Sequence, residues 1–96
     1  MKSEIRYKVP NGKLLNIQLC YDEHCNKIQT ISISGDFFAY PEEAIELLER
    51  KLVNIELNES SLSNVINDFV NTAHVQFIGI NAESLTKTIL MCGNHD

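Results

Sequence analysis

The spacing of the apolar residues changes once along this sequence, and this change limits the folds that the chain can adopt. Up to about residue 34, apolar and polar residues alternate with a period of two, which is typical of half-buried strands. From about residue 41, apolar residues recur every three or four positions, which is typical of amphipathic helices. Strands that are followed by helices, instead of alternating with them, favour an α+β fold.

The first part of the sequence predicts three strands joined by two hairpins. The strands cover residues 4–9, 15–21 and 28–34, and each carries its apolar side chains on one face. The segment Pro10 to Lys13 contains an Asn-Gly pair, which favours a type I′ turn, and residues 22–27 form a longer polar loop. We therefore expect an antiparallel sheet with one face in water and one face that needs a cover.

The second part predicts three helices that provide this cover on one face of the sheet. The first helix begins near Pro41, the second is capped by Ser60 or Ser61, and the third is capped by Asn81. Between the second and the third helix, the extended run 75–80 can pack or pair. The expected core positions are Ala44, Ile45, Leu48, Leu52, Leu62, Val65, Ile66, Phe69, Val70, Ala82, Leu85, Ile89 and Leu90.

Length, composition and charge exclude several classes of protein. A chain of 96 residues is expected to form a single domain, residues 1–96, that buries only about 60 to 65% of its unfolded surface. The 13 acidic and 8 basic residues give a net charge of -5, which argues against nucleic-acid binding because that needs clustered Lys and Arg. No apolar run approaches the ~20 residues of a membrane-spanning helix. Residues 1–4 lack a signal-peptide pattern, so we expect a cytoplasmic protein with reduced cysteines.

Few residues suggest chemistry. The four glycines are too far apart to form a phosphate-binding loop, and no Gly-x-Ser-x-Gly motif is present. Thiolate and imidazole groups could hold zinc or iron, but their spacing lacks a close Cys-x2-Cys pair. A metal site and ordinary reduced thiols beside a frayed tail both remain open as interpretations. The candidate ligands are Cys20, His24, Cys25, Cys92 and His95.

The segment from Gly35 to Pro41 carries three of the seven aromatic residues of the chain. Adjacent residues in an extended segment point to opposite sides, so Phe37 and Phe38 cannot both face the same core. One interpretation is that an aromatic ring packs under the turn while Asp36 bonds the turn backbone. The other is a surface that binds a partner, because aromatic residues are enriched at the centres of interfaces.

Three segments of the sequence, residues 9–15, 31–38 and 41–52, together resemble a known family. They contain the motifs Gly-Lys-Leu-Leu and Gly-Asp-Phe-Phe, followed by an acidic segment expected to be helical. In this order they resemble the accessory domain of lipoate-protein ligases. This domain is usually C-terminal in bacteria and is a separate small subunit in some archaea. The resemblance extends from about Ile5 to Ile89.

The resemblance implies a function. Lipoate-protein ligases use ATP and magnesium to convert lipoate to lipoyl-AMP, and then transfer the lipoyl group to a lysine of lipoyl domains. The large subunit holds lipoate and nucleotide, while the accessory domain binds no cofactor, has no catalytic residue and is needed for activation. Because nothing precedes Met1, we expect a separate small subunit in a heterodimer with the large subunit. The interface candidates are Gly12, Lys13, Gly35, Asp36, Phe37, Phe38 and Tyr40.

Alternatives remain open at this stage. Gly12 and Lys13 can also belong to a plain hairpin turn. The whole chain could be an iron-sulfur cluster assembly scaffold of the NifU or SufE type, whose architecture is similar. That family places a cysteine at the start of the helix after the third strand, where this chain has Tyr40-Pro41-Glu42, although Cys25 and Cys92 could match other ligands. A generic adaptor domain is the third possibility.

Overall fold

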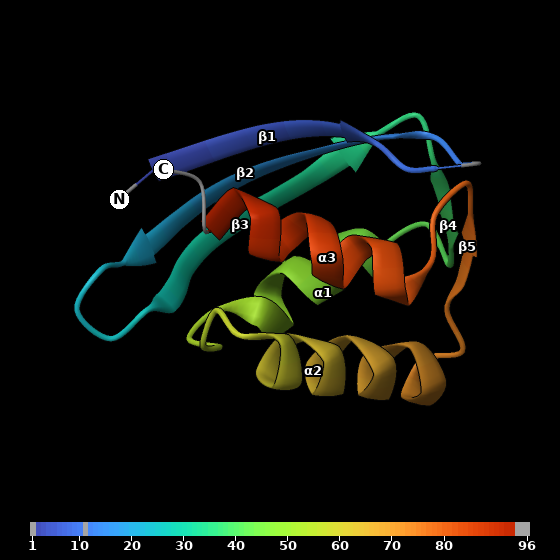
Figure 1. Ribbon diagram of the computed structural model, residues 1–96. Coiled ribbons are helices and arrows are strands. Elements are labelled where there is room, and N and C mark those ends of the chain that lie inside the picture. The colour runs from blue at the N-terminus through green and yellow to red at the C-terminus, as the bar shows by residue number, and fades with distance from the viewer. Residues whose placement is uncertain (1, 11, 94–96) are drawn as a thin grey trace.

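The computed structural model describes residues 2–10 and 12–93. It has an α+β fold in which a three-stranded sheet lies over the helices and a small two-stranded sheet stands at one end (Figure 1). None of the helices in this part of the chain is long and apolar enough to span a membrane. The elements are β1 (Lys2–Lys8), β2 (Leu14–Asp22), β3 (Lys27–Gly35), β4 (Phe38–Tyr40), α1 (Ala44–Leu52), α2 (Glu59–Thr72), β5 (Gln76–Ile78) and α3 (Ala82–Gly93).

The three-stranded antiparallel sheet predicted from the alternating pattern is confirmed. The strands lie in the order β1-β2-β3, and Ile17 of β2 pairs with Ile5 on one side and Ile33 on the other. An irregularity in the register leaves Gln29 without a partner on β2. Because this bulge shifts the alternation by one residue, Ile28 and Ile31 both face the core, where they are at most 8% exposed.

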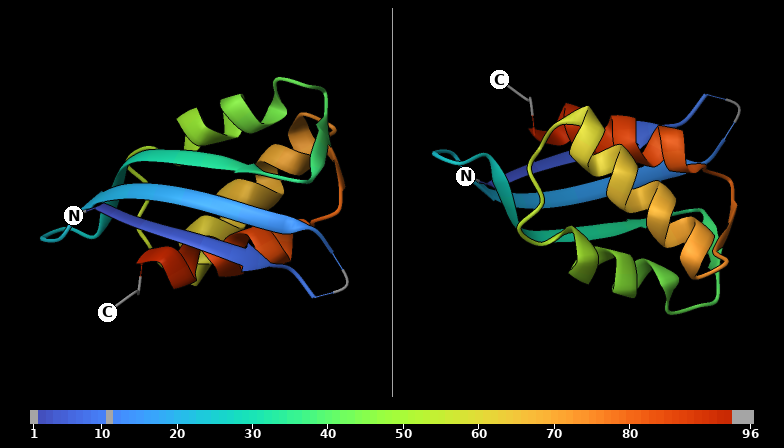
Figure 2. Two further views of the ribbon diagram at one scale, coloured as in Figure 1. Left: turned by 90° about the horizontal axis from the view of Figure 1, so that it is seen from above. Right: turned by 90° about the horizontal axis from the view of Figure 1, so that it is seen from below.

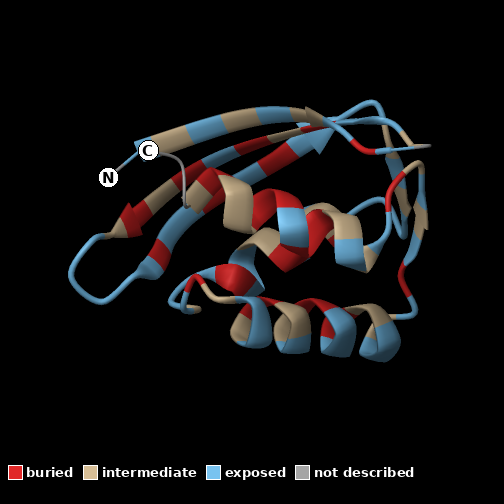
Figure 3. Cartoon of the chain, in the orientation of Figure 1, coloured by how far each residue is buried: buried red, intermediate tan, exposed pale blue. Residues whose placement is uncertain are grey.

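The helices cover one face of this sheet, as expected. Helices α1 and α3 contact the strands directly, whereas α2 packs across α1 and α3 on the side away from the sheet (Figure 2). Buried residues occur along the strands and in all three helices (Figure 3), and they form one hydrophobic core cluster. The edge of β3 is partly covered by α1, where the Ile33 backbone N–H donates a hydrogen bond to Glu49 Oε2 at 2.7 Å.

The turn between β1 and β2 differs from the predicted Asn-Gly turn. The Gly12 N–H donates to the Val9 carbonyl at 2.8 Å, so Pro10 occupies the second position of the turn and Gly12 the fourth, whereas a type I′ Asn-Gly turn would place Gly12 at the third position. Asn11 itself lies outside the described residues. The Lys13 N–H donates to the carbonyl of Gly79, at 2.9 Å, and therefore does not close a two-residue turn within the hairpin. A tertiary contact therefore overrides the local turn preference.

Two of the predicted helix starts are wrong for related reasons. Helix α1 begins at Ala44 instead of Pro41, because the residues before Pro41 form β4 and the chain needs a turn before the helix. Helix α2 is capped by Asn58, whose Oδ1 accepts the Ser61 N–H at 2.7 Å, so Ser60 and Ser61 lie inside the helix. The cap of α3 is confirmed: Asn81 Oδ1 accepts the N–H three residues further along, at 2.7 Å.

Backbone hydrogen bonds hold the segment that joins α1 to α2 against the start of β3. The Ile28 N–H donates to the Ile55 carbonyl at 3.0 Å, and the Leu57 N–H donates to the Asn26 carbonyl at 2.8 Å. Leu57, within this segment, is buried in the core. Residues 54–57 thus extend the sheet along the start of β3 and place Asn58 at the beginning of α2.

Replacing Asn58 by Ala removes the acceptor for the first turn of α2, so we expect the free energy of unfolding to fall by about 1 kcal/mol. Ser60→Ala is the matched control, because Ser60 is exposed and does not cap the helix; its effect should stay within about 0.5 kcal/mol. Urea unfolding of the two variants measures the difference. Equal losses would show that Asn58 is not the cap.

Candidate partner-binding surface

The small sheet of β4 and β5 presents its outer side chains to solvent. Phe38, Tyr40 and Ile78 lie on this outer face and are 64%, 50% and 48% exposed, whereas Ala39 and Phe77 point inward and pack against the core. We call the exposed side chains of Phe38, Tyr40 and Ile78 the end surface. The paired residues are Phe38 with Ile78, Ala39 with Phe77, and Tyr40 with Gln76.

The arrangement of this end surface follows from the sequence before it. Phe37 is half-buried and Phe38 is exposed, which confirms the prediction that the two rings face opposite sides. The preceding Gly35 has φ +150°, and a Cβ there would collide with the carbonyl oxygen of Leu14. Asp36 is exposed, and its backbone N–H donates to the same Leu14 carbonyl at 3.1 Å. The close contact between the turn at Gly35 and the start of β2 therefore directs the chain into β4.

The first hairpin loop contacts the other strand of the small sheet. Gly79, at φ +97°, accepts the Lys13 N–H, and a Cβ on Gly12 would lie only 2.5 Å from the Gly79 carbonyl oxygen. A Cβ on Gly79 would in turn be 3.5 Å from the Cβ of Phe37. Gly12 and Lys13 thus lie next to the aromatic segment, although they are far from it in the sequence. All seven interface candidates predicted from the sequence gather at this end of the molecule.

Sequence reasoning did not identify Ile78 as part of this end surface. The run from residue 75 to 80 is compatible with packing or with pairing, and only the pairing with β4 places Ile78 beside Phe38. Next to Phe38 a shallow hollow lies between β3, β4 and α1. Ile33, Phe37 and Ile45 contribute to its lining, with Glu42 beside them. The end surface is therefore continuous with an apolar depression.

The candidate metal ligands are not brought together. Cys20 lies on the outer face of the sheet and donates to Gln29 Oε1 at 3.3 Å, whereas Cys92 is buried on the other side, 3.8 Å from the Ile17 carbonyl oxygen. His24 and Cys25 are exposed in the loop after β2. Over residues 2–10 and 12–93, no three His, Cys, Asp or Glu residues lie close enough to hold a metal ion. His95 lies outside the described residues.

Two titratable groups, the carboxyl of Asp22 and the thiol of Cys92, have shifted pKa values. The His24 backbone N–H, at 2.8 Å, lowers the pKa of Asp22, and the turn that results holds the loop between β2 and β3. Burial raises the pKa of the Cys92 thiol, so Cys92 resists forming a reactive thiolate. Both shifts therefore have structural causes.

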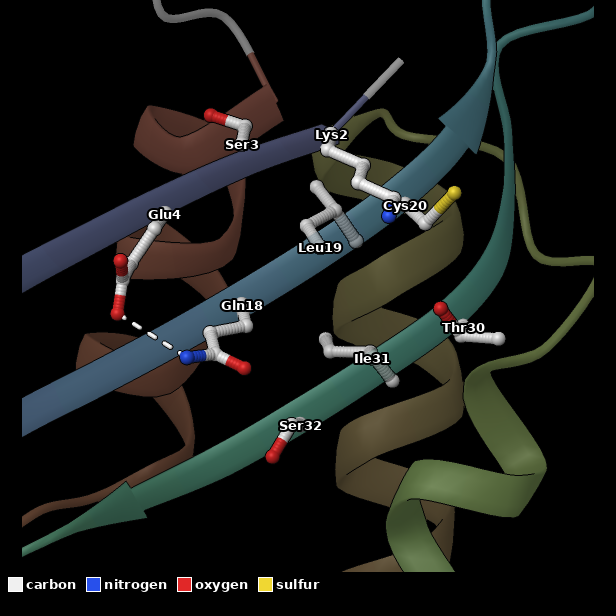
Figure 4. A pocket seen from close by; sticks show the side chains of 9 residues that line it. All are labelled: Lys2, Ser3, Glu4, Gln18, Leu19, Cys20, Thr30, Ile31 and Ser32. Carbon is white, nitrogen blue, oxygen red and sulfur yellow. Dashed lines mark hydrogen bonds between the residues drawn. The ribbon is translucent and has the colours of Figure 1, made fainter.

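The outer face of the main sheet forms a second, polar hollow (Figure 4). The side chains on this face come from all three strands, and Gln18 Nε2 donates to Glu4 Oε2 at 3.1 Å. Leu19 and Ile31 belong to the same strands but are buried in the core. The hollow is lined mainly by polar side chains. Its outward side chains are Lys2, Glu4, Gln18, Cys20, Thr30 and Ser32.

The fold and the end surface define a class of protein: a small α+β domain with exposed aromatic residues, which is typical of domains that act by binding another protein. Comparison with known families makes this class specific. The chain belongs to the family of lipoate-protein ligase C-terminal domains, since the model of the bacterial lipoate protein ligase C-terminus matches residues 8–89.

Individual relatives agree with this family. The chain is similar to lipoate-protein ligase A subunit 2 of Thermoplasma acidophilum, with 38% identity over 55 residues. That match covers 57% of this chain and 56% of the relative, so it spans little more than half the length of the relative. The fold agrees over a longer range with a chain from the solved structure of an archaeal lipoylation system, a bi-partite lipoate protein ligase and its E2 lipoyl domain from Thermoplasma acidophilum. The TM-score is 0.80 at 30% identity, covering 93% of this chain and 94% of that chain.

Replacing Gly35 by Ala should lower the free energy of unfolding by about 1 to 3 kcal/mol, because the new Cβ is strained at φ +150° and collides with Leu14. The matched control is Ser32→Ala on the same strand, where the side chain is exposed and the change should stay within about 0.5 kcal/mol. Thermal or urea unfolding measures both values. A Gly35→Ala variant as stable as the control would contradict this account of the turn.

The remaining thiols should differ strongly in reactivity once Cys20 is replaced by Ser. Cys25 is exposed and should react at once with an aromatic disulfide reagent, whereas Cys92 is 0% exposed and should react only when the protein unfolds. Stopped-flow absorbance at neutral pH resolves the two phases, and Cys25→Ser should remove the fast one. Two fast thiols in the native protein would contradict the packing of α3 against β2.

Proposed function

We propose that this chain is the small subunit of a two-part lipoate-protein ligase. Together with the large subunit it would support the ATP-dependent conversion of lipoate to lipoyl-AMP, which precedes lipoyl transfer to a lysine of lipoyl domains. The observation that carries this proposal is the agreement in fold with a chain of the archaeal bi-partite ligase system over 94% of that chain. The similarity to subunit 2 of the Thermoplasma acidophilum ligase supports the same assignment.

The proposal assigns this chain a noncatalytic role. Residues 1–96 would form a single accessory domain, and ATP, Mg²⁺ and lipoate would bind to the large subunit. The structural role of three glycines supports the assignment of nucleotide binding to the large subunit. Gly12, Gly35 and Gly79 permit close contacts between backbone segments, which is a structural use and differs from cradling a phosphate.

The partners and the cellular setting follow from the same role. The direct partner would be the large subunit, and lipoyl-domain proteins would be met through that complex in the cytoplasm. Of the interface candidates, Phe38 and Tyr40 are the two whose rings are most open to a partner. The expected likeness of the architecture to iron-sulfur scaffolds of the NifU or SufE type stays a prediction.

The decisive experiment is a reconstitution of the activation step. Adding this chain to its large subunit should increase lipoate-dependent exchange between ATP and pyrophosphate by at least about tenfold, a reduction of the activation barrier by roughly 1.4 kcal/mol. This chain alone and the large subunit with heat-denatured chain are the controls. No gain over the large subunit alone would overturn the proposed function. Metal analysis of anaerobically purified protein tests the scaffold alternative, which requires stoichiometric iron.

A further inference from the structure

We propose that the end surface is the site at which this chain binds the large subunit, and that it enters an apolar recess with basic side chains at its rim. This inference rests on the proposed function and adds the surface and the chemistry of the partner. It separates the residues that build this end of the molecule from the residues that present a binding face. The presenting residues are Phe38, Tyr40 and Ile78.

The distribution of exposed apolar side chains singles out this end. Among the described residues, Phe38, Tyr40 and Ile78 are the most exposed large hydrophobic residues, whereas Leu47 on α1 and Val53 just after α1 are only 38% and 39% exposed. A fully buried aromatic residue removes about 150 to 250 Å² from water, and Phe38 and Tyr40 still have half or more of their surface to bury, so they supply part of the apolar centre of an interface of about 800 Å² per partner. Exposed aromatic residues that are grouped in this way are typical of interface hot spots.

The same residues are held in place before any partner arrives. The β4 and β5 strands pair through all three positions, and their inner residues Ala39 and Phe77 pack against the core. The Lys13 N–H bond to Gly79 fixes the end of β5, and the bond from Asp36 to Leu14 fixes the approach to β4. Binding would therefore cost little ordering of the backbone, which favours affinity.

Charge around the end surface indicates what kind of partner fits. Asp36, Glu42 and Glu43 are exposed before and after β4 in the sequence, whereas Lys13 is exposed beside Gly79 at the same end, so the three carboxylates outweigh this ammonium group. Two copies of this chain meeting through their end surfaces would bring these carboxylates together, and such like-charge contacts are unfavourable. A partner with Lys or Arg around an apolar recess would instead be attracted. The observations therefore favour a different protein over a second copy.

The test measures binding of variants to the large subunit. Phe38→Ala and Tyr40→Ala should each weaken binding by about thirtyfold, since truncated hot-spot residues typically cost 2 kcal/mol or more. Leu47→Ala is the matched control, because Leu47 is an exposed apolar residue on α1, and its effect should stay below about threefold. Calorimetric titration gives the dissociation constants. Unchanged thermal unfolding shows that each variant is folded, as expected for exposed side chains.

A second variant tests the charge argument independently. Asp36→Asn, Glu42→Gln and Glu43→Gln combined should slow association about tenfold at low salt and reduce its salt dependence, while the dissociation rate changes little. Surface plasmon resonance with the immobilised large subunit resolves the two rates. An unchanged association rate would overturn the proposal that basic side chains surround the recess of the partner.

The possible outcomes separate the surface from the function. If the unmodified chain neither binds the large subunit nor raises its exchange activity, the proposed function and this inference both fail. If the unmodified chain binds and activates the large subunit, and the Phe38 and Tyr40 variants do so equally well, the assignment of the end surface as the binding site is overturned. The proposed function then stands. A chain that dimerises through Phe38, or that sediments with phosphatidylcholine vesicles through it, would overturn the assignment of the large subunit as the occupant.

Discussion

The structure depends on the place where the first hairpin loop crosses the end of β5. There the Lys13 N–H donates to the Gly79 carbonyl at 2.9 Å, and Gly12 has no side chain that would keep the two segments apart. This bond joins the sheet layer to the segment that leads from α2 to α3. Since β4 pairs with β5 at the same end, one small region connects β3 to α1 and α2 to α3. The connection from β3 to α1 and the connection from α2 to α3 are thereby held together at this end of the molecule (Figure 1).

Much of this architecture could be predicted because it depends on local pattern. The period-two segments give the three strands, the later period of about 3.6 gives the three helices, and the order of the two patterns gives the α+β class. The small sheet could be expected only as a run that can pack or pair. Its strands are three residues each and distant in the sequence, so too few residues carry the pattern for the pairing to be visible. Long-range pairing of this kind is decided by the assembled core.

The errors of prediction have the same origin. Ser60 is a favourable helix cap, but Asn58 caps α2. Pro41 is a favourable first residue of a helix, but it lies in the turn between β4 and α1. The Asn-Gly pair favours a tight turn, but the Lys13 N–H binds the Gly79 carbonyl. Each replacement occurs where the chain is already held by a neighbouring segment. The site shows the same division: the opposite orientation of adjacent rings follows from extended geometry, whereas Ile78 joins them only through pairing. Local preferences therefore predict elements better than they predict the ends of elements.

Size and surface together explain why a chain of this kind would act through a partner. A chain of 96 residues spends most of its apolar side chains on its own core, and the remaining large ones among the described residues are most exposed at the end surface. In the free chain these rings contact water, which is unfavourable, and covering them yields free energy in proportion to the area removed from water. The rigid frame of β4 and β5 lowers the ordering cost of that step, and the surrounding carboxylates limit which surface can cover the rings. The features that make this end costly in isolation are thus the ones that would make its association strong and selective.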